Sequence, residues 1–214
     1  MKNINQNPNE ITLFVKVAAK SESTEKAKQA LLDDVHGAWN ENGNYKMEIY
    51  EAKNKPDIFY LFERWQNQEA LENHFKQPYT GGAFDLQKAD LTEPIEMNYL
   101  TDLFPLDKPR SKEIHKALTT LIVPFEVRSG EGDALTALFE KFVPLVRQES
   151  GNVEFHIHSV KGNADLFILY ERWESQQYLD AHNKRQTTAD FIQNAGKLLN
   201  GEIMEAIIFV NDIS

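Results

Sequence analysis

The sequence contains no cysteine, and this absence removes several classes of chemistry. Disulfide bonds, thiolate nucleophiles and zinc or iron–sulfur sites with cysteine ligands are all excluded. The chain also lacks an apolar run of 18 residues, which a membrane-spanning helix needs. Its first ten residues, MKNINQNPNE, lack the apolar stretch of a secretory signal. We therefore expect a cytoplasmic protein with no membrane partner.

Positive charge is also scarce, because 23 Lys and Arg face 33 Asp and Glu, for a net charge of −10. Nucleic acids and anionic membranes bind clustered cations, so both are disfavoured as partners. The sequence has no GxGxxG fingerprint, P-loop, HExxH helix or GxSxG elbow. These absences predict a protein that uses no flavin, nicotinamide or nucleotide cofactor.

The sequence does contain an internal repeat. The segment LFERW at 61–65 returns as LYERW at 169–173, 108 residues later. The same offset relates further pairs: Thr12 and Thr120, Val15 and Val123, Val35 and Val143, Ile49 and Ile157, Phe59 and Phe167, Leu71 and Leu179, His74 and His182. An ungapped register from residue 12 to residue 74 indicates a duplication. Each copy, of roughly 100 residues, is long enough to be a small domain.

Residue patterns in the two copies predict the same order of elements. Copy one reads as a strand at 11–19, a helix at 22–41, strands at 45–52 and 58–65, helices at 68–76 and within 78–92, and a strand at 94–103. Copy two reads as a strand at 118–127, a helix at 131–149, strands at 153–160 and 165–173, a helix capped by Ser175, a helix at 187–199 and a strand at 202–210. Pro144 is expected to kink the long helix of copy two.

This order is β-α-β-β-α-β, the ferredoxin-like unit, in which helices cover one face of an antiparallel sheet. We therefore predict an α+β fold with a flexible arm at 1–10, a first repeat at 11–103, a linker at 104–116 and a second repeat at 117–214. The uncovered faces of two such sheets can pack together, which predicts an intrachain dimeric α+β barrel. A further homodimer of the whole chain is left open.

The motif Glu-Arg-Trp at a strand end, followed nine residues later by a helical histidine, resembles the antibiotic biosynthesis monooxygenase family. The resemblance covers nearly the whole chain as two tandem copies. It implies the dimeric α+β barrel, and the family includes cofactor-independent quinol and anthrone monooxygenases, haem-degrading monooxygenases and a quorum-signal isomerase. In the haem-degrading members of the family, the position of the histidine resembles a Trp, and an Asn of the first strand is part of the site. The first-strand positions here are Val15 and Val123, which disfavours haem degradation.

The resemblance implies that His74 or His182 acts as general base on a phenolic substrate. Arg64 or Arg172 would then stabilise the oxyanion, and Trp65 or Trp173 would form a flat pocket wall. Glu63 and Glu171 alternate onto the same strand face as the tryptophans and are further candidates for substrate contact. The alternative is structural: the tryptophans anchor the core, the Glu-Arg pairs form surface or interface ion pairs, and the histidines are satisfied or solvent-facing residues.

His156 and His158 are spaced to share one face of a strand, and their equivalents in copy one are Glu48 and Tyr50. We expect Val153, Phe155 and Ile157 to form the core on the other face. Two imidazoles on one face can hold a metal ion, but the sequence indicates no third ligand. We therefore predict no metal site and assign His156, His158 and Tyr50 to substrate contact. If only one copy is active, the additional imidazoles favour the C-terminal half.

Two functional hypotheses of different class follow. The first is a cofactor-independent monooxygenase that oxidises a small aromatic or quinol-like molecule with O2. The second is a non-catalytic α+β barrel that binds a small ligand or is associated with stress, because a fold does not imply a function.

Overall fold

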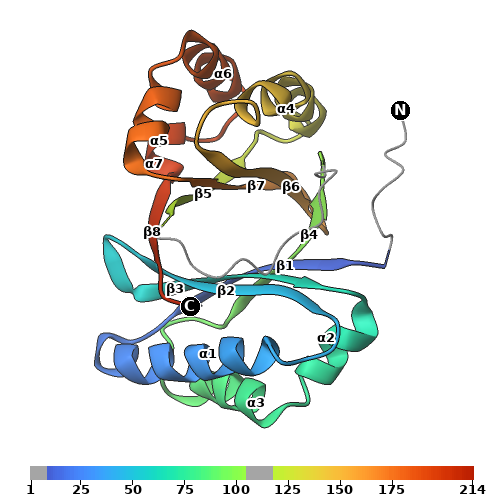
Figure 1. Ribbon diagram of the computed structural model, residues 1–214, viewed down its shortest axis with the longest axis vertical. Coiled ribbons are helices and arrows are strands. Elements are labelled where there is room, and N and C mark those ends of the chain that lie inside the picture. The colour runs from blue at the N-terminus through green and yellow to red at the C-terminus, as the bar shows by residue number, and fades with distance from the viewer. Residues whose placement is uncertain (1–8, 105–117) are drawn as a thin grey trace. The chain divides into compact units, whose positions relative to one another are not determined.

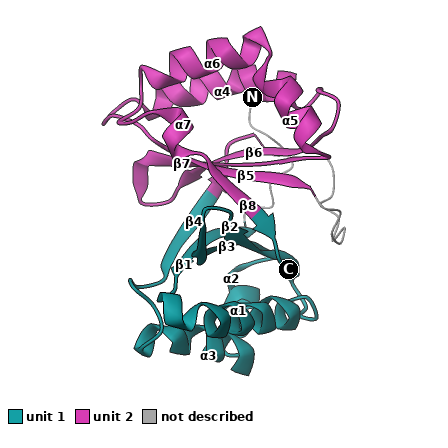
Figure 2. Ribbon diagram, turned by 90° about the vertical axis from the view of Figure 1, so that its left-hand side faces the viewer, with its two compact units in different colours: residues 1–100, 107–114, 211–214 teal, residues 101–106, 115–210 magenta. Residues whose placement is uncertain are grey.

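The computed structural model describes residues 9–104 and 118–214. Most of the expected N-terminal arm and linker lies outside the described residues. The chain divides into two compact units, which Figure 2 shows in teal and magenta. Among the described residues, no helix combines the length and apolar character needed to cross a bilayer.

Unit 1 is an antiparallel four-stranded sheet with helices on one face (Figure 1). Its strands run in the order β4-β1-β3-β2. Their bounds are β1 Ile11–Ala18, β2 Asn44–Ala52, β3 Lys55–Trp65 and β4 Glu96–Asp102. The helices are α1 Thr24–Ala38, α2 Gln68–His74 and α3 Pro78–Asp85, with 3₁₀ turns at Ser21–Ser23 and Leu86–Lys88.

Unit 2 repeats this arrangement, with strands in the order β8-β5-β7-β6. The strands are β5 Thr119–Glu126, β6 Asn152–Val160, β7 Asn163–Trp173 and β8 Ile208–Asp212. The helices are α4 Gly132–Val146, α5 Gln176–Asn183, α6 Gln186–Gly196 and α7 Ile203–Ala206. Both ferredoxin-like repeats are thus confirmed, while the barrel formed by their packing stays a prediction.

Each unit includes a short segment that the sequence assigns to the other repeat. Residues 211–214 belong to unit 1, where the amide of Ile213 donates to the carbonyl of Ile49 at 3.1 Å. Residues 101–104 belong to unit 2, where the amide of Leu103 donates to the carbonyl of Ile157 at 3.1 Å. The fourth strand of each repeat therefore extends beyond its own unit, which an assignment by sequence range does not reveal.

The hydrophobic core of each unit lies between its sheet and its helices. In unit 1, Leu61 and Trp65 of β3 pack against Leu31 and Val35 of α1. In unit 2, the equivalent Leu169 and Trp173 of β7 belong to a core that includes many phenylalanines. Strand alternation therefore directs every second side chain of β3 and β7 toward the helices.

Several local expectations are corrected. The predicted last strand begins with the helical turn α7, and strand β8 starts only at Ile208. Ser175 occupies the N-cap position of α5 but makes no capping hydrogen bond with its side chain, whereas Asn67 accepts one from the amide of Ala70. Val153 is 43% exposed rather than part of the core, since the register of β6 and β7 shifts beside it. Pro144 lies within the last turn of α4, which ends at Val146, and the kink expected there stays a prediction.

Gly43 sits where the chain turns from α1 into β2, with φ at +90°. A Cβ at this position would lie 2.7 Å from the Cβ of Ala70 in α2. At Gly130, with φ at +87°, an added Cβ would meet nothing within 4 Å. We expect Gly130→Ala to lower the free energy of unfolding by about 1–2 kcal/mol, the cost of the left-handed conformation. Gly43→Ala should lose about 1–3 kcal/mol more through overpacking. Equal losses in urea denaturation would contradict the close approach at Gly43.

Candidate functional site

The end of strand β3 places Glu63 and Trp65 under the helices of unit 1. The indole Nε1–H of Trp65 donates to Glu63 Oε2 at 2.8 Å. Both side chains are buried, with 4% of Glu63 and none of Trp65 exposed. A buried carboxylate whose one hydrogen-bond donor among the described residues is an indole N–H is incompletely solvated, so its charged form is destabilised.

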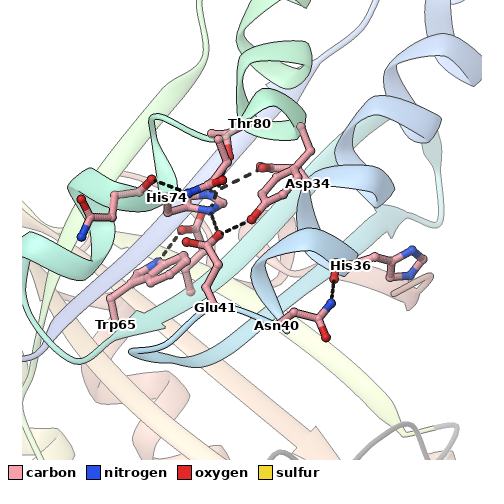
Figure 3. A network of polar contacts seen from close by, with 11 residues as sticks. Asp34, His36, Asn40, Glu41, Trp65, His74 and Thr80 are labelled. Atoms are coloured by element: carbon pink, nitrogen blue, oxygen red, sulfur yellow. Dashed lines mark hydrogen bonds and ion pairs between the residues drawn. The ribbon is translucent and has the colours of Figure 1, made fainter.

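His74, the last residue of α2, lies against Trp65, with ring centroids 4.5 Å apart. Its Nδ1 is 2.7 Å from Oε1 of Glu41, which follows α1 (Figure 3). The hydroxyl of Tyr79 donates to the same oxygen at 2.9 Å. The cap at Asn67 sets where α2 starts, and two turns of helix then bring His74 back over the strand end.

Asp34 of α1 and Thr80 of α3 complete the cluster around His74 (Figure 3). Asp34 Oδ1 is 3.6 Å from His74 Nε2, and Thr80 Oγ1 is 3.4 Å from His74 Nδ1. Asp34 is 5% exposed, and Oδ1 has no hydrogen-bond partner among the residues that the structure describes. Buried carboxylate oxygens normally have partners, so this oxygen is a candidate for ligand contact.

A cavity of about 30 Å³ lies between the sheet and the helices at this cluster. Its polar lining consists of Asp34, Glu63, His74 and Thr80, and its apolar lining of Val15, Val17, Leu31, Leu61, Phe75, Ala83, Phe84, Ile95 and Met97. One buried water needs roughly 10–15 Å³ by this kind of measure, so the cavity has room for a few waters.

Burial raises the pKa of the acidic groups in this cavity. Desolvation raises the pKa of Glu63 to about 7, opposed by the charge of His74 and the hydrogen bond from Trp65. Desolvation also raises the pKa of Asp34, again opposed by His74. A carboxyl group with a pKa near 7 can accept or release a proton at neutral pH, which is the property that general acid–base chemistry requires.

The second unit repeats part of the cluster. Trp173 Nε1–H donates to Glu171 at 3.1 Å, His182 Nδ1 is 3.1 Å from Glu149 Oε2, and the Arg185 guanidinium also contacts Glu149 at 3.0 Å. Burial raises the pKa of Glu171 to about 7. Burial also lowers the pKa of His182, against the effect of Glu149.

In unit 2, phenylalanines stand at two positions whose equivalents in unit 1 line the cavity. By the 108-residue offset, Phe142 stands at the position of Asp34 and Phe191 at that of Ala83. Their rings stack 4.3 Å apart at 8°, and Phe139 packs on Phe191 at 4.7 Å. The additional imidazoles favoured the C-terminal half as the active one, if only one is active. The packed phenylalanines of unit 2 give that expectation no support.

The predicted site residues divide between two faces of each sheet. His74, Glu63 and Trp65 lie together on the helix-covered face, as do their equivalents in unit 2. Arg64 lies on the opposite face, where Nη1 donates to Thr12 Oγ1 at 2.9 Å, and Arg172 likewise contacts Glu154 at 3.3 Å. The structure does not bring either arginine to the histidines, because adjacent residues of a strand point to opposite faces.

The opposite faces also carry Tyr50, His156 and His158. Tyr50 donates its hydroxyl proton to Glu48 Oε2 at 2.6 Å. The rings of His156 and His158 stack at 6.0 Å. Within each unit, these residues lie on the face of the sheet away from the His74 or His182 cluster, so their role in substrate contact stays a prediction.

Sequence reasoning missed Glu41, Asp34 and Thr80. Glu41 and Thr80 recur as Glu149 and Thr188 at the repeat offset, and this recurrence was a usable signal. Asp34 does not recur, because Phe142 replaces it, but its spacing from Ala27 and Leu31 puts a carboxyl group on the apolar face of the helix, which was a second usable signal.

Replacement of Glu63 tests its protonation. Burial raises the pKa of Glu63 from 4.5 in the unfolded chain to about 7. The contribution of the neutral carboxyl group to the free energy of unfolding is therefore fully present below pH 4.5 and is lost as the pH rises to 7. Glu63→Gln should therefore gain stability relative to the parent over this range, by about 3 kcal/mol in total. Urea denaturation at several pH values measures the difference, with the surface variant Glu25→Gln as control. A difference that does not change with pH would show that Glu63 ionises normally.

Comparisons with known proteins agree with this architecture. The family model for antibiotic biosynthesis monooxygenase matches residues 11–85 and again residues 119–194. A search of curated protein sequences finds no match. Three crystal structures share the fold over almost the whole chain.

Two of these structures, from Fusobacterium nucleatum and Lactobacillus acidophilus, are of proteins named putative monooxygenases. The first has a TM-score of 0.83 at 13% identity and covers 98% of this chain and 94% of its own. The second has a TM-score of 0.75 at 12% identity and covers 96% and 95%. An anthrone oxidase-like protein has a TM-score of 0.70 at 14% identity and covers 97% and 92%. With both repeats matched by the family model, the chain belongs to the antibiotic biosynthesis monooxygenase family as two tandem copies of its domain.

Proposed function

We propose that the N-terminal repeat is a monooxygenase site that oxidises a small phenolic or quinol-like molecule with O2. The observation that carries this proposal is the cavity beside His74, in which carboxyl groups with raised pKa values face an otherwise apolar wall. Membership of the monooxygenase family and the similarity in fold to an anthrone oxidase-like protein support the reaction class.

The chemistry begins with removal of a phenolic or anthrone proton by the His74–Glu63–Asp34 cluster. The resulting anion is rich in electrons and reduces O2 directly. One oxygen atom forms a new C–O bond to the substrate carbon, and the other leaves as water with two substrate hydrogens. The substrate supplies all four electrons, as when a naphthol and O2 give a naphthoquinone and water, so no external reductant is required.

His74 is the residue through which a proton can leave the cavity. It contacts Glu41 on one side and lies near Asp34 on the other, so a proton taken from the substrate has successive acceptors. Glu63, held by Trp65, presents a carboxyl group whose pKa of about 7 matches the operating pH of a general base. Trp65 donates a hydrogen bond to Glu63 and lies against the ring of His74, and its role as a pocket wall stays a prediction.

An aromatic substrate needs more room than the few waters that the cavity can hold. Phe75 and Phe84 both line the cavity and meet edge to face with ring centroids 5.7 Å apart. Rotation of either ring would open space for a substrate ring beside His74, and the apolar lining would then exclude water from the reacting atoms. A homodimer and a cytoplasmic location remain predictions that this site does not depend on.

Oxygen uptake tests the proposal. Purified protein is assayed with dihydroxynaphthalenes and anthrones, without added flavin or nicotinamide. We expect His74→Gln to lower kcat about 10²- to 10⁴-fold, the usual contribution of general acid–base catalysis. His182→Gln, the matched change in the second repeat, should leave kcat within about twofold. With ¹⁸O2, the quinone should carry one labelled oxygen. Ligands that bind but return unchanged would instead favour the non-catalytic binding protein.

A second variant tests which of the two repeats contains the reaction site. Asp34→Phe combined with Ala83→Phe copies the stacked pair of Phe142 and Phe191 into unit 1 and should fill the cavity. We expect oxygen uptake to fall to background while the far-UV circular dichroism spectrum is retained. Phe142→Leu serves as the control in unit 2 and should leave uptake unchanged. Full activity in the filled variant would locate the reaction elsewhere.

A further inference from the structure

His156 and His158 of strand β6 meet an aspartate that is far from them in the sequence. Strand β4 ends at Asp102, and the amide of the next residue, Leu103, donates to the carbonyl of Ile157. This hydrogen bond places Leu103 and Ile157 together on the helix-covered side. Asp102 therefore points to the opposite face, toward the two histidines that flank Ile157.

The three side chains form a compact buried cluster within unit 2. One ligand atom from each of Asp102, His156 and His158 lies within 4.8 Å of the other two. Asp102 is 8% exposed, His156 is 3% exposed and His158 is fully buried. Asp102 Oδ1 and His158 Nε2 are 3.2 Å apart. Two ligands at about 2.0–2.1 Å from one tetrahedral ion are about 3.4 Å apart, so this pair already has a suitable spacing.

The hydrogen bonding of His158 presents the nitrogen that metal ligation requires. His158 Nδ1 is 3.1 Å from the backbone carbonyl of Ile168, which can only accept a hydrogen bond. Nδ1 therefore carries a proton, and in the neutral ring the lone pair of Nε2 is on the side of Asp102 Oδ1. Two acceptors at 3.2 Å repel each other unless a proton or a cation lies between them. Metal-binding histidines in proteins commonly donate their other N–H to a backbone carbonyl in this way.

We propose that Asp102, His156 and His158 bind one divalent transition-metal ion, such as Zn²⁺ or Co²⁺. Two imidazoles and one carboxylate are a donor set that suits ions of this class, and three protein ligands leave a further coordination position for water or a small ligand. The sequence predicted no metal site because its third ligand was missing. Asp102 supplies this ligand from a strand that begins in the other unit.

Unit 1 offers a comparison, since the same face there has a different composition. Lys46, Glu48 and Tyr50 of β2 occupy the positions of Glu154, His156 and His158. The Lys46 ammonium lies 3.2 Å from Glu48 Oε2, to which Tyr50 also donates. A lysine ammonium in contact with the carboxylate disfavours a second cation, so we expect the metal site in unit 2 alone.

Metal binding by the whole chain, prepared without a histidine tag, tests the proposal. The protein is unfolded in chelator and refolded with Co²⁺ or Zn²⁺, because the cluster is buried. We expect one ion per chain after gel filtration, visible absorption bands from bound Co²⁺, and a melting temperature that rises with metal concentration. Bound metal below one ion per ten chains, without a change in melting temperature, would overturn the proposal. The cluster would then be a proton-bridged His–Asp ion pair.

Variants then assign the ligands. His158→Gln and His156→Gln, which preserve much of the side-chain size, should each weaken Co²⁺ binding by at least about 100-fold, and Asp102→Asn by at least about tenfold. His36→Ala removes an exposed histidine of α1 and should bind like the parent. If a ligand variant fails to refold, as judged by circular dichroism, the stoichiometry and spectrum of the parent still decide the outcome. Undiminished binding in folded His158→Gln would place the ion elsewhere and overturn the assignment.

Discussion

The alternation of side chains along strands β3 and β7 is the constraint on which the rest of the structure depends. In Glu63-Arg64-Trp65, the first and third residues must share a face and the second must point away. Burying Trp65 in the core therefore buries Glu63 beside it, because both lie under the same helices. The indole N–H satisfies one carboxylate oxygen, and desolvation leaves the carboxyl group with a pKa near neutrality. The same geometry places Arg64 in a separate environment, against the ring of Phe62.

The two repeats keep this constraint but differ in what surrounds it. In unit 1, Asp34 and Ala83 leave a cavity with a polar side, at the cost of burying a carboxyl oxygen that has no hydrogen-bond partner in the part of the chain that the structure describes. In unit 2, Phe142 and Phe191 fill the equivalent space and add apolar burial and aromatic contact. The strand motif and the histidine that both repeats contain thus belong to the shared scaffold, and the residues on the covering helices decide whether that scaffold encloses a cavity.

The end of the last strand of each repeat belongs to the other unit. The faces of the two sheets that lie away from the helices also differ in the residues they carry. Asp102 and Asp212 each precede a residue whose amide binds the carbonyl at the centre of β6 or β2. The aspartates are equivalent in position, yet Asp102 meets two imidazoles, whereas the strand beside Asp212 carries a lysine, a glutamate and a tyrosine. A duplicated backbone has therefore produced two faces with opposite preferences for a cation.

The sequence by itself determined the duplication, the ferredoxin-like order of elements and the family. These depend on local periodicity and on an ungapped repeat, and each residue contributes to them through near neighbours. It also made His74, Glu63 and Trp65 candidates, through their recurrence in both repeats and the resemblance to the family. It could not bring Asp34 or Thr80 to His74, reject Arg64 as a partner of His74, or supply Asp102 to His156 and His158. Those relations join residues on different elements, and only the packing of helices on the sheet and the exchange of strand ends decide which side chains meet.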